Sequence, residues 1–181
     1  FRIINEYLDA IIYIPKPVNY TIQSNISNYI PCLFLKDRSN KISNNFIIMF
    51  HGNAEDIFTS RNMGVALRQK ICMNVIIVEY PGYSLYKGEP NANIIQDDTI
   101  IVYEFIKNFF NLEDRNIFVF GRSIGSSPAI YLASKKKPNA LVTVSAFTDI
   151  RAVAKNLVRL LNIFLKNRFN SIDYIKNVTC P

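Results

Sequence analysis

A serine between two glycines is the clearest chemical signal in this sequence. The segment Gly121-Arg122-Ser123-Ile124-Gly125 follows a short apolar run and precedes a stretch that is suited to a helix. In a strand–turn–helix setting, the two glycines let strand and helix approach closely, and the serine is raised to the edge of the sheet. The backbone N–H of Ile124 would then face any oxyanion that forms there. We therefore take Ser123 as the candidate nucleophile, with Gly121 and Gly125 shaping its turn.

The same segment has a simpler interpretation. A Gly-Ser loop between a strand and a helix can merely pack the helix or bind a phosphate group. Neither G-x-x-x-x-G-K-[ST] nor a glycine-rich G-x-G-x-x-G occurs in the chain, so a nucleotide-binding domain is not expected.

Two further segments that follow apolar runs carry polar and aromatic side chains. The first is Phe50-His51-Gly52-Asn53-Ala54-Glu55-Asp56, which contains the only histidine of the chain. The second runs from Glu79 to Pro90 and places Tyr80, Tyr83 and a third tyrosine among glycines and prolines, which are typical of a loop. This loop would form a wall of an active-site cleft, or else a rigid connection that packs over the edge of the sheet.

The elements that must position these loops alternate between short apolar runs and amphipathic stretches. Strands are expected at residues 31–35, 46–50, 75–79, 117–120 and 141–144, the first of them at an edge. Such short, continuous, β-branched runs are typical of strands buried on both faces. Helices are expected at residues 59–71, 92–110, 124–135 and 149–165. This order indicates a single α/β domain over residues 1–181, with a mainly parallel sheet and helices on both faces.

The two ends of the chain follow this alternation less clearly. Pro15 and Pro17 interrupt any helix in the first thirty residues. Residues 172–181 look like the lead-in to another strand, so we expect a sheet that lacks its last strands.

Composition and charge exclude several classes of function. Hydrophobic residues make up 49% of the chain, which rules out a disordered chain, and no apolar run is long enough to span a membrane. The net charge is +7, but the only basic run, Lys135 to Lys137, fits a solvated helix end, so no nucleic-acid partner is expected. One histidine and three cysteines without a C-x-x-C pair are too few ligands for zinc, so neither a metal nor a cofactor is expected. The odd cysteine count favours a reducing compartment, with Cys32 and Cys72 as small buried residues.

Together, the three loop segments resemble the α/β-hydrolase superfamily. The likeness is closest to the branch of intracellular or membrane-associated serine hydrolases that includes the protein depalmitoylases, or acyl-protein thioesterases. That branch shows HGNA after a strand, a Y-x-G-Y loop ending in G-x-P, and G-x-S-I-G or G-R-S-x-G. Here the motifs stand in the same order as His51-Gly52-Asn53-Ala54, Tyr80-Pro81-Gly82-Tyr83 with Gly88-Glu89-Pro90, and Gly121-Arg122-Ser123-Ile124-Gly125. The resemblance covers roughly residues 30–181.

The resemblance implies an α/β-hydrolase fold and a serine hydrolase that cleaves an ester or thioester by acyl transfer. The backbone N–H of Asn53, with that of Ala54 as the neighbouring candidate, would join the N–H of Ile124 in an oxyanion hole. Tyr80 and Tyr83 would then line the cleft beside the reacting carbonyl.

The resemblance also implies a base and an acid that follow the nucleophile in the order serine, acid, histidine. His51 precedes Ser123 and is therefore not the expected base, and no histidine follows Ser123. Of the later acids, Asp149 is better explained as a helix cap, and Asp173 precedes the expected next strand. The catalytic acid and histidine are therefore expected beyond Pro181. The fold is expected to stop before its last strands, and the segment by itself to be inactive.

Two functions remain open at this point. The first is a serine hydrolase acting on a small-molecule or acylated-protein substrate, in the cytoplasm or at the cytoplasmic face of a membrane, with peripheral membrane contact left open. The second is a non-catalytic hydrolase-like module that lacks a complete triad and binds a partner or a lipid. The oligomeric state is not indicated.

Overall fold

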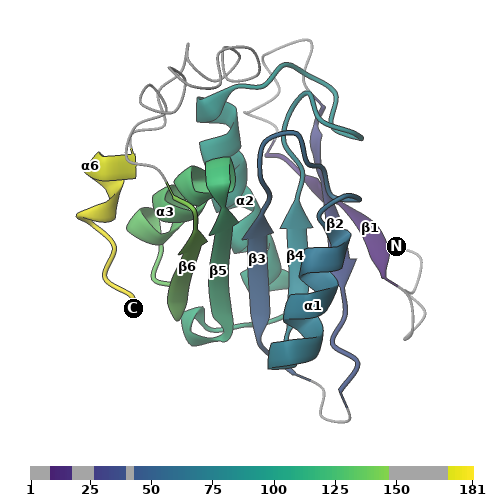
Figure 1. Ribbon diagram of the computed structural model, residues 1–181, viewed down its shortest axis with the longest axis vertical. Coiled ribbons are helices and arrows are strands. Elements are labelled where there is room, and N and C mark those ends of the chain that lie inside the picture. The colour runs from purple at the N-terminus through teal and green to yellow at the C-terminus, as the bar shows by residue number, and fades with distance from the viewer. Residues whose placement is uncertain (1–8, 18–26, 40–42, 147–170) are drawn as a thin grey trace.

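The computed structural model describes residues 9–17, 27–39, 43–146 and 171–181. Within them, six strands form one sheet in the order β1-β2-β4-β3-β5-β6 (Figure 1). The strands are β1 Ala10–Pro15, β2 Tyr29–Leu35, β3 Phe46–Phe50, β4 Asn74–Val78, β5 Ile117–Arg122 and β6 Ala140–Val144. β3, β4, β5 and β6 pair in parallel, whereas β1 and β2 are antiparallel. The carboxyl ends of the parallel strands therefore meet at one edge.

The central strands confirm the expectation from apolar runs. Every residue of β3 and of β4 is buried, which explains why these strands are continuously apolar rather than alternating. The prediction that residues 31–35 form an edge strand is wrong, because β1 pairs outside β2. Pro15 ends β1, and a proline is tolerated there because an edge strand leaves some N–H groups unpaired.

β6 corrects the expectation of burial on both faces. Its residues are half-buried or exposed, and the Val142 and Val144 side chains are 51% and 42% exposed. Among the described strands β6 is the outer neighbour of β5, so it has one sheet partner only. The backbone N–H of Leu141 donates to the carbonyl of Pro181, at 2.9 Å. Pro181 thus contacts the β6 edge, whereas the segment begins with a short helix, α6 Ser171–Ile175, rather than with a strand.

Helices cover both faces of the sheet. α1 Arg61–Ile71 packs on one face, and α2 Ala92–Phe109 and α3 Ser126–Lys135 pack on the other (Figure 1). Two short 3₁₀ turns, η2 Asp114–Asn116 and η3 Ser123–Gly125, precede β5 and α3. The helix expected at residues 149–165 lies outside the described residues. None of the helices in the described ranges is long and apolar enough to cross a membrane.

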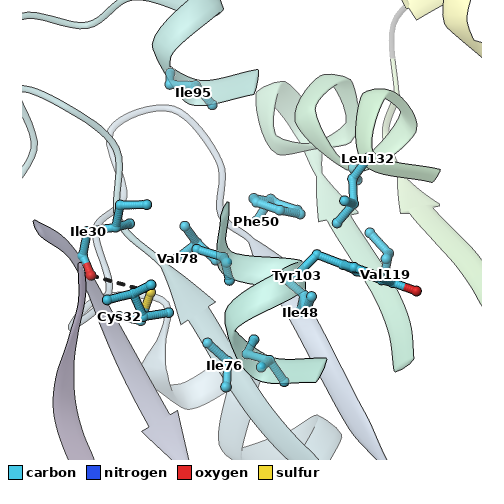
Figure 2. Packing of buried hydrophobic residues seen from close by; sticks show 14 of the residues in the cluster. Ile30, Cys32, Ile48, Phe50, Ile76, Val78, Ile95, Tyr103, Val119 and Leu132 are labelled. Atoms are coloured by element: carbon cyan, nitrogen blue, oxygen red, sulfur yellow. Dashed lines mark hydrogen bonds between the residues drawn. The ribbon is translucent and has the colours of Figure 1, made fainter. Parts of the chain in front are cut away.

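Side chains that alternate along the strands fill two cores. Figure 2 shows part of the larger one, in which Ile48, Phe50 and Val78 of the sheet pack with Tyr103 of α2 and Leu132 of α3. The smaller core lies under α1. Cys32 is fully buried in the larger core, as expected, but Cys72 is exposed because it forms the left-handed C-cap of α1.

Two backbones come unusually close where β3 ends and η3 begins. A Cβ added to Gly125 would lie 2.3 Å from the carbonyl oxygen of Phe50 and 2.5 Å from that of His51. A Cβ added to Gly121 would lie 2.5 Å from the carbonyl oxygen of Gly125 and 2.7 Å from Cβ of Ala129. No side chain fits at either position, so both glycines are required for β3, β5 and α3 to meet.

A buried polar cluster anchors the loop that follows β4. Asp98 of α2 pairs with Lys16 at 2.7 Å and accepts a hydrogen bond from the Tyr86 hydroxyl at 2.6 Å. The side chains of Lys16 and Asp98 are 5% and 2% exposed. Burial raises the pKa of Asp98 to about 6, against the opposing effect of the Lys16 charge. The cluster ties the loop to α2 and to the residue after β1.

The close backbone approach predicts the effect of one added methyl group. Gly125→Ala would press Cβ against two main-chain oxygens, so we expect the free energy of unfolding to fall by about 1–3 kcal/mol or more. Gly64→Ala in α1 is the matched control. Its Cβ would meet only the ends of two side chains at 2.8 Å, and alanine favours a helix by about 1 kcal/mol. Urea denaturation measures both variants, and equal destabilisation would contradict this account.

The buried Asp98 predicts a pH dependence. Because its pKa is raised in the folded state, proton binding by Asp98 stabilises the fold below about pH 4, and this contribution is lost as the pH rises through 6. The stability of the wild type relative to Asp98→Asn should therefore decrease from pH 4 to pH 7, by up to about 3 kcal/mol. Denaturant titrations of both proteins across this range measure the difference. A difference that is constant with pH would show that Asp98 titrates normally.

Candidate active site

Ser123 lies at the turn between β5 and η3 with an unusual backbone conformation. Its φ is 53°, in the left-handed region that costs an ordinary residue about 1 kcal/mol or more. Its side chain is half-buried rather than covered. A left-handed, accessible serine between a parallel strand and a helix has the geometry of a nucleophile elbow.

The segment after β3, residues 51–56 (the 51–56 loop), lies against Ser123. A Cβ built on Gly52 would lie 3.7 Å from Cβ of Ser123, although the two residues are far apart in the sequence. Asn53 follows in this loop and is half-buried. Within the described residues, its backbone N–H has no acceptor. The N–H of Ile124 lies in the first helical turn, where backbone donors have no intrahelical partner. These are the two donors that the sequence predicts for an oxyanion.

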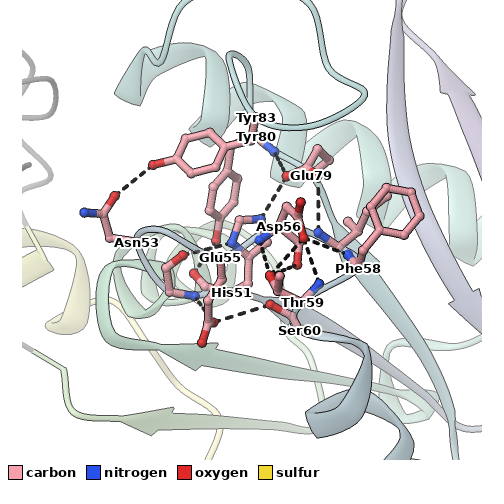
Figure 3. A network of polar contacts seen from close by, with 12 residues as sticks. His51, Asn53, Glu55, Asp56, Phe58, Thr59, Ser60, Glu79, Tyr80 and Tyr83 are labelled. Atoms are coloured by element: carbon pink, nitrogen blue, oxygen red, sulfur yellow. Dashed lines mark hydrogen bonds and ion pairs between the residues drawn. The ribbon is translucent and has the colours of Figure 1, made fainter.

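His51 has both ring nitrogens engaged away from Ser123. The ring is fully buried, with Nδ1 3.0 Å from the carbonyl oxygen of Gly52 and Nε2 3.0 Å from Oε1 of Glu79 (Figure 3). A general base must reach the proton that it removes. The geometry therefore agrees with the prediction that His51 holds its own loop rather than activating Ser123.

Glu79 is the acid that organises this side of the site. Its side chain is fully buried, and its carboxylate accepts hydrogen bonds from the backbone N–H groups of Ile57, at 3.2 Å, and Tyr80, at 3.1 Å, besides facing His51. This role of Glu79 is not predicted by the sequence motifs. The available signal was an acidic residue directly after four aliphatic residues. Burying a charge there costs free energy unless the carboxylate is paired and hydrogen-bonded.

The two tyrosines of the predicted cleft wall both contact the 51–56 loop. The Tyr80 hydroxyl donates to the His51 carbonyl oxygen at 2.9 Å, and the Tyr83 hydroxyl donates to Oδ1 of Asn53 at 2.9 Å. Burial raises the pKa of Tyr83 to about 12 and that of Tyr80 well above its usual value, so both keep the proton that they donate. Tyr80 lies buried beneath the loop, while Tyr83 is half-buried at its side (Figure 3).

Glu55 links the 51–56 loop to the residue before the serine. Its carboxylate accepts the backbone N–H of Gly52 at 2.9 Å and the Ser60 hydroxyl at 3.4 Å, and it forms an ion pair with Arg122. Glu55 and Arg122 both stand within the predicted motifs, but the sequence predicts no role for either, because nothing in the local pattern pairs residues so far apart.

A base and an acid for Ser123 are not found in the described residues. His51 is the only histidine of the 181 residues, and its ring nitrogens contact Gly52 and Glu79. Asp173 lies exposed on α6, and Asp149 lies outside the described residues. The described residues thus place the Ser123 hydroxyl beside the backbone of Asn53 and Ile124, at the ends of β3 and β5, without a base next to it.

Comparison with curated proteins finds hydrolase relatives, whereas no protein-family model matches the chain. Protein L404 of Acanthamoeba polyphaga mimivirus, which carries an alpha/beta-hydrolase name, is 24% identical over 196 residues, covering 98% of this chain and 73% of that protein. Alpha/beta hydrolase domain-containing protein 17C of Mus musculus is 28% identical over 155 residues, covering 85% of this chain. The chain spans 47% of the length of that mammalian relative.

Solved structures with similar backbones are also hydrolases. The esterase Pf2001 of Pyrococcus furiosus superposes with a TM-score of 0.64 at 19% identity, covering 96% of this chain and 67% of that one. The serine hydrolase XC6422 of Xanthomonas campestris gives a TM-score of 0.59 at 14% identity, covering 76% and 61%. At these identities the likeness concerns the fold. Together with the sheet order, it shows that the chain has the α/β-hydrolase fold, and the curated relatives that it resembles carry alpha/beta-hydrolase names.

Proposed function

We propose that the protein is a serine hydrolase that cleaves an ester or thioester by acyl transfer through Ser123. The observation that carries the proposal is the left-handed φ of 53° at Ser123, a strained conformation held at the carboxyl end of a central parallel strand. The 51–56 loop beside it offers the N–H donors that acyl transfer requires. Hydrolase names among the relatives support the same class of reaction.

In this mechanism the Ser123 hydroxyl attacks the carbonyl carbon and forms a tetrahedral intermediate. The N–H groups of Asn53 and Ile124 donate hydrogen bonds to its negatively charged oxygen. A histidine takes the serine proton and returns it to the leaving alcohol or thiol, and water then releases the acyl group by the same route. We propose that this histidine and its acid partner follow Pro181.

The finer proposal is that the substrate is a lipidated protein or a lipid. It depends on the likeness of the three motifs to those of the depalmitoylase branch. The alternative is a hydrolase-like module that binds a partner without turnover. Full-length protein that binds an acylated peptide but neither hydrolyses it nor reacts with a serine-directed probe would favour the module.

Ser123→Ala tests the nucleophile directly. In the full-length protein, a fluorophosphonate probe should label the wild type, and the variant should lose labelling because no other hydroxyl occupies the elbow. Ser134→Ala is the matched control, since the Ser134 hydroxyl only donates to the carbonyl of Tyr131 within α3. Gel fluorescence measures labelling. Undiminished labelling of Ser123→Ala would overturn the assignment.

Asn53→Ala separates the backbone donor from the side chain. The Asn53 amide oxygen only accepts from Tyr83, whereas the proposed oxyanion donor is the main-chain N–H, which alanine retains. We expect kcat to stay within about tenfold of the wild type, and Tyr83→Phe, which removes the same hydrogen bond, to behave alike. Loss of an oxyanion donor costs roughly 10²–10³ in kcat. A loss of that size in Asn53→Ala, but not in Tyr83→Phe, would show that the Asn53 side chain rather than its main-chain N–H is the oxyanion donor.

A further inference from the structure

Glu55 brings a negative charge close to the place where the proposed reaction develops one. A Cβ built on Gly52 would lie 3.2 Å from Oε2 of Glu55 and 3.7 Å from Cβ of Ser123, so the carboxylate and the nucleophile flank the same glycine. A fixed carboxylate beside a developing oxyanion raises the energy of the transition state. The presence of a carboxylate at Glu55 therefore calls for an explanation, and its charge must be neutralised.

Hydrogen bonding explains why an acceptor oxygen stands at this position. Oε2 of Glu55 accepts the backbone N–H of Gly52 across three residues, which closes the turn that contains Asn53 and Ala54. Ala54 adopts a left-handed φ of 58° within this turn. Because the turn is closed at Gly52, the same carboxylate restrains the direction of the next donor in the chain, the N–H of Asn53.

Arg122 supplies the neutralising charge. It is the last residue of β5, directly before Ser123, and its guanidinium pairs with Oε1 of Glu55. The two side chains are 40% and 24% exposed, so the pair is neither deeply buried nor freely solvated. One carboxylate thus spans the two elements that the reaction must keep in register, the 51–56 loop and the elbow.

We propose that Glu55 and Arg122 are positioning residues for the reaction at Ser123: Glu55 holds the oxyanion turn through the Gly52 N–H, and Arg122 cancels the charge that the Glu55 carboxylate carries. The inference rests on the proposed function. The two residues contribute unequally to the reaction. The acceptor oxygen of Glu55 is needed, whereas the negative charge of its carboxylate is not. An ion pair that only stabilises the fold would make both partners equally important.

Four variants of the full-length protein distinguish these cases. Glu55→Gln keeps an acceptor oxygen and removes the charge, and should keep at least a third of the wild-type kcat. Glu55→Met removes the acceptor and should lower kcat roughly 10–100-fold. Arg122→Met leaves the carboxylate uncompensated and should lower kcat by a similar factor. Adding Glu55→Gln to Arg122→Met should restore most of the loss.

Further readouts separate positioning from stability. KM should change little in every variant, and the affinity for a boronic acid transition-state analogue should fall in step with kcat. Added salt should partly rescue Arg122→Met, since the unpaired charge is screened, but not Glu55→Met. Arg115→Met, which breaks the exposed pair with Glu113, is the matched control and should leave kcat unchanged.

The outcomes are distinct. If Glu55→Gln is as damaging as Glu55→Met, or if the double variant fails to recover, the positioning inference is wrong even where Ser123 is labelled. Thermal unfolding of each variant is measured in parallel, and losses of kcat that only follow lost folded protein would also overturn it. If Ser123→Ala retains activity, the proposed function itself fails first.

Discussion

The meeting of two main chains at Gly125 is the constraint on which the candidate site depends. The start of η3 rests against the carbonyl oxygens of Phe50 and His51, with no room for a Cβ between them. This contact joins the end of β3 to the turn that carries Ser123. It brings together two loops that are remote in the sequence. Because the contact is made through rigid backbone, the register of Ser123 and the 51–56 loop is set by strand pairing rather than by flexible side chains.

Two glutamates then hold the 51–56 loop from opposite sides. Glu79, at the end of β4, faces the buried His51 and accepts the Ile57 N–H, while Glu55 accepts the Gly52 N–H and faces Arg122 of β5. Each carboxylate satisfies a backbone donor that the irregular loop leaves without a secondary-structure partner. The loop is therefore shaped by polar contacts with both neighbouring strands.

Much of the site was predictable because its signals are local. The G-x-S-x-G pattern requires only that a strand precede it and a helix follow, and both follow from a few consecutive residues around Ser123. The partners of Glu55 and Glu79 were not predictable in this way. Arg122 is 67 residues from Glu55, and His51 is 28 residues from Glu79. Nothing in the composition of either segment selects its partner, since such pairs exist only once the strands lie side by side.

The sequence by itself determined the strands β2 to β6 and the helices α1 to α3, whereas β1 and α6 were not expected from it. Runs such as FIIMF and NVIIV are apolar and β-branched throughout, and a chain that alternates such runs with amphipathic helices can bury both faces only in a mainly parallel sheet. Tertiary structure alone decided the strand order, with β3 between β4 and β5, the outer position of β1 and the exposure of β6. The physical reason is that hydrophobic periodicity reports whether a residue is covered, whereas the identity of its neighbour depends on long-range packing and on backbone contacts such as that at Gly125.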